Sequence, residues 1–310
     1  MSSERPGAVS APSPLDLTLI AVGVAGVSAS APLIAASAVP ALALAMWRNT
    51  MASGLLVPLA LMRQRSELRS LSRSEVRVLV LAGLLLAAHF ATWIPSVKLT
   101  GVASSTTLVA SQPVWSALLA RRQGQLVTRG TWWGIAVAVV GVAFISGIDV
   151  TVSRDAVVGD LLAILGGALA AAYMTAGARA RRTVSTTVYT AVCYSTTALT
   201  LLPVCVIFGQ SLGGYSGADW LRLVALTVTA QLLGHSVFNR VLKTTSATVV
   251  SLSILFEGPG AALMAAAFLQ QYPRWAQLPG FLLLLVGVAM VIRSARPTVA
   301  GDPGEAAPAE

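Results

Sequence analysis

The sequence predicts an all-α integral membrane protein whose ten transmembrane helices form a 5+5 inverted-topology repeat. Three observations predict this fold class. The chain is strongly apolar, because 55% of its 310 residues are hydrophobic and only 11% are charged, whereas about a quarter of the residues in a soluble domain are charged. Apolar runs of the roughly 20 residues that a bilayer-spanning helix needs recur along the chain. Matching residues also recur at a nearly constant spacing in its two halves.

Loops and helix-breaking residues divide the apolar sequence into ten expected spans. Pro32 and Pro40 place the break between the first two near residues 36–40. The expected spans are 17–35, 40–62, 78–97, 101–120, 131–148, 159–178, 187–208, 219–238, 246–269 and 277–294. The predicted organisation is a disordered tail at 1–14, a first five-helix repeat at 15–148, an external linker at 149–158, a second five-helix repeat at 159–294, and a disordered tail at 295–310.

Pairs of identical residues reveal the repeat. Near the start of each half the spacing is 144, between Asp16 and Asp160, or 145, between Pro58 and Pro203. Further along each half it is 146, and a difference of one or two residues in loop length explains the change. Because five helices is an odd number, the second repeat must cross the membrane in the opposite direction. Inverted repeats of this kind are typical of secondary transporters. The pairs that lie 146 positions apart are His89 and His235, Pro113 and Pro259, Gly134 and Gly280, and Gly141 and Gly287.

Positive charges are distributed unequally between the two sides that this topology defines. With both termini in the cytoplasm, the outer loops hold Lys98, Arg154, Arg222 and Arg274, and Arg48 lies inside the second span. The cytoplasmic loops hold sixteen positive charges and the outer loops four, and an excess of this size in short loops fixes the orientation of the chain in the membrane by the positive-inside rule. It also explains the net charge of +9 without nucleic-acid binding. The sixteen cytoplasmic charges are Arg5, Arg63, Arg65, Arg69, Arg73, Arg77, Arg121, Arg122, Arg129, Arg179, Arg181, Arg182, Arg240, Lys243, Arg293 and Arg296.

The span 246–269 carries an acid, Glu257, and a proline, Pro259, near its middle. An ionisable group in hydrocarbon costs a few kcal/mol, and proline interrupts the helix, so this span should face a water-filled cavity or other helices. Glu257 could bind a cationic group or carry a coupling proton, since burial favours the neutral form of a carboxyl. The alternative is a structural acid that bonds the broken helix. Pro113 is expected to break the matching span 101–120.

His89 and His235 occupy equivalent places in the two repeats and are the only histidines of the chain. An imidazole can donate and accept hydrogen bonds and can change its charge near neutral pH. The functional interpretation is substrate contact or a proton relay, and the structural one is a histidine bonded to a neighbouring backbone carbonyl.

Arg48, beside Trp47 near the start of its span, has two interpretations as well. It could anchor the helix at the headgroups, or it could bind a substrate carboxylate or a helix C-terminus. Further candidates for the cavity lining are Trp93, Gln112, Trp115, Tyr173, Gln231 and Asn239.

Several other kinds of site are not expected. Cys193 and Cys205 lie roughly 18 Å apart on one helix, too far for a disulfide, and are interpreted as packing residues. The sequence has no metal-ligand cluster, nucleophile motif or phosphate-binding loop. No cofactor is expected, and proton coupling is a hypothesis.

The repeat and its motifs resemble the drug/metabolite transporter (DMT) superfamily, in particular EamA-type transporters, over nearly all of residues 16–294. The matching motifs are Pro113 and Gly141-Val142-Ala143 in the first half, with SATVVSLSILFEGPGAALMAAAF and Gly287-Val288-Ala289 in the second.

The chain departs from the family pattern at two points. Many members have Glu-Pro where this chain places Gly258 between Glu257 and Pro259. Members also often end the fourth and ninth helices with Gly-Glu, whereas the acid is absent from Arg122-Gln123-Gly124 and Leu269-Gln270-Gln271.

The resemblance implies export or exchange of small metabolites, often amino acids. It also implies a central cavity with the spans 131–148 and 277–294 peripheral to it. The spans that would line most of the cavity are 17–35, 78–97, 101–120, 159–178, 219–238 and 246–269.

We therefore expect a secondary-active transporter of the plasma membrane that exports a small metabolite such as an amino acid by alternating access around a midplane cavity. Its partners would be that substrate and the lipid bilayer, and a homodimer is compatible with this expectation. A multidrug or cation efflux carrier is the main alternative. A non-transporting membrane scaffold would not need symmetric helix breaks, and an intramembrane enzyme would need a polar cluster at one interface, which this chain lacks; enzymatic activity is not expected.

Overall fold

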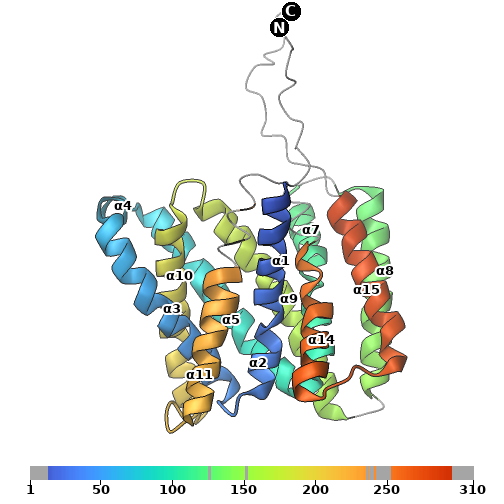
Figure 1. Ribbon diagram of the computed structural model, residues 1–310. Coiled ribbons are helices and arrows are strands. Elements are labelled where there is room, and N and C mark those ends of the chain that lie inside the picture. The colour runs from blue at the N-terminus through green and yellow to red at the C-terminus, as the bar shows by residue number, and fades with distance from the viewer. Residues whose placement is uncertain are drawn as a thin grey trace, which may run out of the picture.

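A computed structural model describes residues 13–124, 127–150, 153–234, 237, 241 and 253–294. All regular elements in these ranges are helices, and most of them run side by side in one bundle (Figure 1). The first half comprises α1 (Pro14–Ser28), α2 (Ser30–Ala36), α3 (Ala41–Arg63), α4 (Arg65–Ser70), α5 (Arg73–Thr100), α6 (Val102–Val109), α7 (Gln112–Arg122) and α8 (Arg129–Val150). The second comprises α9 (Arg154–Ala180), α10 (Thr186–Ile207), α11 (Gly217–Leu226), the π-helix η1 (Thr227–Gly234), α14 (Glu257–Leu269), the 3₁₀-helix η2 (Trp275–Gln277) and α15 (Leu278–Ser294).

Local sequence explains where several helices begin. Ser13 and Ser72 form capping boxes with Asp16 and Glu75, so the first turns of α1 and α5 have their free backbone donors satisfied. Ser185 caps α10 in a simpler way, accepting from the backbone N–H of Val188. The predicted break after the first span lies at residues 37–40, and a further one-residue interruption at Ala29 separates α1 from α2.

Five helical segments are long and apolar enough to cross a membrane by length and composition alone. The chain is therefore a multi-pass helical protein, while the number of ten crossings stays a prediction. Shorter or more polar helices occupy the other expected spans wherever these are described. The five segments are Pro14–Ala36, Arg73–Thr100, Arg154–Ala180, Thr186–Ile207 and Trp275–Ser294.

Helix pairing follows the twofold relation that the repeat predicts. Two pairs of equivalent helices contact each other across the halves, α3 with α10 and α8 with α15, and the equivalent spans 101–120 and 246–269 contact each other through α6 and α14. The contacts of α5 with α9 and of α1 with η1 are exchanged by the same relation. Figure 1 shows α8 and α15 together at one edge of the bundle, far from α3. A bundle of two interlocked repeats results.

Paired glycines bring α8 and α15 into backbone contact. A Cβ built on Gly141 would lie 2.5 Å from the Leu284 amide nitrogen and 2.8 Å from the Gly280 carbonyl oxygen. A Cβ on Gly287 would lie 2.6 Å from the carbonyl oxygen of Gly134. These are the glycines that the sequence repeat pairs, and the two contacts are related by exchanging the repeats. Small residues of this kind allow close helix approach in membranes.

Arginines gather at one end of the bundle, which we call the basic end. Its loops are joined by hydrogen bonds from the Ser185 amide to Glu67 Oε1 (2.6 Å) and from Thr128 Oγ1 to the Ser294 carbonyl (3.2 Å); α4 and the end of α15 lie at the top of Figure 1. The opposite end, where α2 and α11 lie at the bottom of Figure 1, includes the end of α5 with Lys98, the start of α9 with Arg154, α11 with Arg222, and Arg274 just before η2. The described charges of the basic end are Arg63, Arg65, Arg69, Arg73, Arg77, Arg121, Arg122, Arg129, Arg179, Arg181, Arg182 and Arg293.

Replacing Gly141 by alanine should destabilise the fold, because the added methyl group meets the backbone of α15 and must push the two helices apart. Overpacking of this kind costs about 1–3 kcal/mol, so the melting temperature of the detergent-solubilised protein should fall by several degrees. Gly54→Ala is the matched control, since no heavy atom lies within 4 Å of a Cβ at that position. Equal melting temperatures for the two variants would contradict the close contact.

Candidate functional site

A cavity of about 240 Å³ lies between helices of both repeats. It is bounded by residues from the middle parts of α5, α9 and α10, by the junctions of α1 with α2 and of α6 with α7, and by η1 and the start of α14. No residue of α8 or α15 is among its described lining, as expected for peripheral helices. In addition to the spans expected to line most of the cavity, α3 and α10 contribute one residue each, Arg48 and Tyr194.

Most of the residues singled out from the sequence line this one cavity. Pro259 lies one position beyond Gly258, which also lines it, whereas His235 and Asn239 are outside the described residues. Bringing residues from so many helices together is a result of the tertiary fold. The predicted residues in the lining are Arg48, His89, Trp93, Gln112, Pro113, Tyr173, Gln231 and Glu257.

Two broken helices meet at the cavity. Helix α6 ends at Val109, a turn follows, and α7 begins at Gln112 with Pro113 in its first turn. In the second repeat, a turn precedes α14, which begins at Glu257. Helix N-termini carry a positive partial charge, so two such ends, one from each repeat, face the same cavity. The breaks expected near Pro113 and Pro259 are therefore present.

Arg48 is buried, with 2% of its surface exposed. Its Nε donates to Gln231 Oε1 (2.7 Å), and its guanidinium lies 4.4 Å from the centre of the Phe90 ring. Nη1 is buried with no hydrogen-bond partner among the described residues. This position excludes the headgroup-anchor interpretation and leaves the guanidinium available to a group in the cavity.

Glu257 supplies a carboxyl group to the same cavity from the second repeat. Within the described part of the chain, the one ion pair is that of Arg222 with Asp219, so Arg48 and Glu257 do not contact each other directly. The backbone carbonyl of Glu257 accepts from Ser28 Oγ at 3.4 Å, which ties α14 to α1. Groups of opposite charge thus border one cavity from opposite repeats.

His89 makes the backbone contact of its structural interpretation and also lines the cavity, while a role in substrate contact or proton relay stays a prediction. Its Nδ1 lies 2.9 Å from the Gly166 carbonyl oxygen; since a carbonyl only accepts, Nδ1 carries the proton. Its ring stacks on Trp93, with centroids 5.8 Å apart and an angle of 9° between the planes. The histidine is therefore fixed by α9 while it borders the cavity, and the indole Nε1 of Trp93 is buried without a described hydrogen-bond partner.

Gln112 and Tyr173 complete the candidates that line the cavity. Gln112 Nε2 contacts Met174 Sδ at 2.6 Å, which bridges α7 and α9 beside the helix break. Sequence reasoning did not select Asn49, Phe90, Met174 or Tyr194. Asn49 and Tyr194 are polar side chains within apolar spans, which is a usable signal, whereas nothing in the sequence distinguishes Phe90 from a packing residue.

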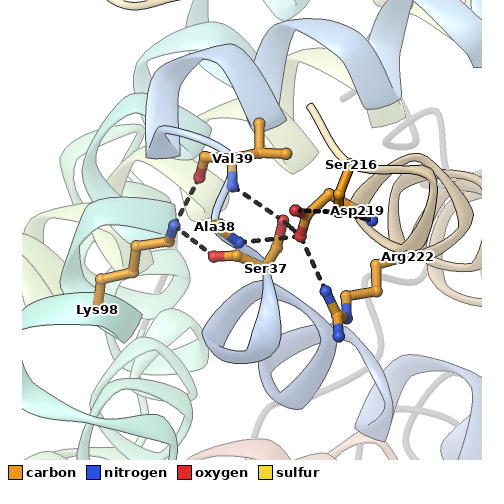
Figure 2. Close-up of polar contacts among 7 residues, drawn as sticks. All are labelled: Ser37, Ala38, Val39, Lys98, Ser216, Asp219 and Arg222. Atoms are coloured by element: carbon orange, nitrogen blue, oxygen red, sulfur yellow. Dashed lines mark hydrogen bonds and ion pairs between the residues drawn. The ribbon is translucent and has the colours of Figure 1, made fainter. Parts of the chain in front are cut away.

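Polar contacts close the bundle at the opposite end (Figure 2). Lys98 Nζ donates to the carbonyl oxygens of Ser37 (2.9 Å) and Val39 (2.6 Å). Asp219 Oδ1 accepts from the Ala38 amide (3.0 Å), from Ser37 Oγ (3.4 Å) and from Arg222 Nη1 (2.9 Å). The loop 37–40 is thereby held between the end of α5 and the start of α11, and Val39 is fully buried.

Two further contacts join helices at this end. Thr100 Oγ1 donates to Asp160 Oδ1 at 2.6 Å, which links α5 to α9. Gln277 Nε2 donates to Ser104 Oγ at 3.2 Å, which links η2 to α6.

A family model described as the EamA-like transporter family matches this chain twice, over residues 15–147 and 157–293. The chain belongs to this family. The two matches agree with the two repeats that pair in the structure. Members of the EamA-like family are transporters, so a small-molecule substrate and a membrane setting follow for this chain at that level of description.

Solved structures support the fold. One, described as "Crystal structure of protein", shares 18% sequence identity with the chain at a TM-score of 0.59, and the match covers 89% of this chain and 96% of the other. At that identity the likeness concerns the fold alone. No curated protein matches the chain.

Asp219→Ala should loosen the opposite end, because it removes the hydrogen bonds from the Ala38 amide and Ser37 Oγ to a carboxylate, and a hydrogen bond to a charged group contributes about 1.5–3 kcal/mol. Labelling of Val39→Cys by a maleimide should then become roughly 10-fold faster, since about 1.4 kcal/mol corresponds to a factor of ten. The labelled protein would have alanine in place of Cys193 and Cys205, the two native cysteines, which are buried and free.

The matched control for this prediction is Arg222→Ala. Arg222 is the exposed partner of Asp219, with 37% of its side chain accessible, and an exposed ion pair contributes about 0–1 kcal/mol. Labelling in this control should change only slightly. The same labelling rate with Asp219 and with alanine at that position would show that these contacts do not hold the end closed.

Proposed function

We propose that this EamA-like protein is a secondary-active exporter of a small metabolite that carries a carboxylate, such as an amino acid, and that it works by alternating access around the central cavity. The observation that carries the proposal is the pairing of Arg48 and Glu257 in one cavity without a direct ion pair between them. An unpaired charge inside a membrane protein is costly and usually serves a substrate or ion pathway.

The electrostatics of the cavity favour a molecule with two unlike charged ends. A carboxylate in the cavity would meet positive potential from Nη1 of Arg48 and from the N-termini of α7 and α14. The carboxyl of Glu257 offers a partner to an ammonium group. Aromatic side chains, among them Phe90, Trp93 and Tyr173, supply apolar surface for the remainder of the molecule. An amino acid combines these three properties.

Alternating access is supported by the interlocked repeats and by the contacts of the opposite end. A twofold relation between the halves gives states open to either side similar energies. The arginine bias supports a cytoplasmic basic end by the positive-inside rule; both termini would then be cytoplasmic, and the loop 37–40 would close the outer side. The setting would be the plasma membrane, and transport would run outward.

A multidrug or cation efflux carrier is the second candidate, and the aromatic lining beside Glu257 is the observation that favours it. Cations would interact with the aromatic faces and with the carboxylate. Arg48 distinguishes the two functions, because a buried guanidinium repels a purely cationic substrate.

Arg48→Gln should reduce uptake of the carboxylate substrate at least about 10-fold, because a charge-assisted bidentate contact is lost. Counterflow in proteoliposomes would be measured with labelled amino acids, using Arg154→Gln at the exposed opposite end as the control. Cationic drugs form a second substrate panel. Transport of drugs with no effect of Arg48→Gln would favour the multidrug function, and no transport of either panel would overturn the exporter proposal.

Glu257→Gln should lose the response of export to a pH gradient, if Glu257 carries the coupling proton, and it should also slow counterflow of amino acids, because the ammonium group loses its charged partner. The physical reason is that an amide preserves the shape of the carboxyl but cannot exchange a proton. Net export from loaded proteoliposomes would be compared at equal pH and with acid outside, with Glu75→Gln at the start of α5, remote from the cavity lining, as the control. An unchanged rate and an unchanged pH dependence in Glu257→Gln would exclude this form of coupling.

A further inference from the structure

A glutamine from the second repeat fixes the orientation of the Arg48 guanidinium. Gln231 lies in η1, is 2% exposed, and accepts the hydrogen bond from Arg48 Nε at 2.7 Å. Its own Nε2 donates to Asn49 Oδ1 at 3.0 Å, and Asn49 Nδ2 donates to the Ala45 carbonyl at 2.8 Å. The contact therefore crosses between the two repeats within the wall of the cavity.

The order of donors and acceptors in this chain is fixed. The Ala45 carbonyl can only accept, so the nitrogen of Asn49 must face it and the oxygen of Asn49 must face Gln231. The nitrogen of Gln231 then faces Asn49, which leaves its oxygen for Arg48. The Ala45 carbonyl thus fixes the amide of Asn49 directly and that of Gln231 through Asn49, and the face of Phe90 holds the guanidinium from one side.

The hydrogen bond to Gln231 determines which edge of the Arg48 guanidinium a carboxylate can bind. A carboxylate can bind an arginine in two bidentate ways, across Nε and one Nη or end-on across both Nη atoms. Gln231 occupies Nε, while Nη1 has no described partner. The end-on approach is the one that remains for a carboxylate in the cavity.

We propose that Gln231 is a positioning residue that presents the two Nη atoms of Arg48 end-on to the substrate carboxylate and thereby sets the preference for acids over their neutral amides. This inference rests on the proposed function, because it needs a substrate carboxylate at Arg48. The π-helical backbone of η1 is consistent with it, since π-helical turns are found frequently at functional sites.

The test compares binding of acids and of the matching amides. The probes are L-leucine, L-phenylalanine and L-threonine with their primary carboxamides, and the readout is the ligand-induced rise in melting temperature of the full-length protein in detergent, titrated to an apparent Kd. Wild type should bind at least one acid more tightly than its amide. Gln231→Met should weaken binding of that acid about 10- to 100-fold while binding of the amide stays unchanged, because the methionine fills the space without accepting from Nε.

A second variant keeps the proposal testable where Gln231→Met fails to fold. Gln231→Glu has nearly the same shape, and its carboxylate would pair with Arg48 and compete with the ligand, but it cannot donate to Asn49 Oδ1; the preference for the acid should disappear in protein that still unfolds cooperatively. The control is Thr229→Val in the same π-helical segment; the hydroxyl that it removes donates to the Ala225 carbonyl one turn earlier, so this variant should keep the wild-type preference.

The outcomes separate this inference from the proposed function. If wild type prefers the acid and the Gln231 variants keep the same preference, Gln231 is a packing residue and the inference is overturned while the exporter proposal stands. If wild type binds acid and amide equally, or binds neither, the carboxylate site at Arg48 is wrong and both proposals are overturned. Loss of the preference in Thr229→Val as well would show a general disturbance of η1 and would also overturn a specific role for Gln231.

Discussion

Backbone hydrogen bonding in lipid is the constraint on which the rest of this structure depends. A peptide group without a partner costs several kcal/mol in hydrocarbon, so an interrupted helix is tolerated only where protein or a water-filled cavity covers it. The interruptions before α7 and before α14 meet this condition, because both border the central cavity. The repeat places these two defects face to face, and the cavity follows from that placement.

The same constraint divides the helices into regular ones that pack at the edge of the bundle and irregular ones that surround the cavity. α8 and α15 are uninterrupted helices that contact each other through paired glycines at the edge of the bundle and contribute nothing described to the cavity. The helices that contain breaks, buried polar groups or a π-helical turn surround the cavity. Stability therefore depends mainly on regions where the backbone is regular, and the chemistry lies where it is irregular.

Much of this organisation could be predicted from the sequence, and the reason is physical. Apolar length and the spacing of prolines and glycines are properties of the chain itself, so the helical class, the repeat and the two breaks follow from them. Contacts such as that of Gln231 with Arg48 depend on how helices rotate and pack, which no local pattern encodes. Arg48 illustrates the limit, because its position beside Trp47 is compatible with a headgroup anchor until the fold shows it buried beneath Phe90.

The symmetry of the scaffold also contrasts with the asymmetry of its polar groups. The position equivalent to Glu257 in the first repeat is Ser111, and the charged guanidinium of Arg48 belongs to the first repeat alone among the described cavity residues. A symmetric frame makes two states of similar energy accessible, whereas unlike groups at equivalent positions give the bound molecule one preferred orientation. A substrate with an acidic end and a basic end fits this division, because each end finds its partner on a different repeat. Movement of one repeat against the other would then change both ends of the site at once.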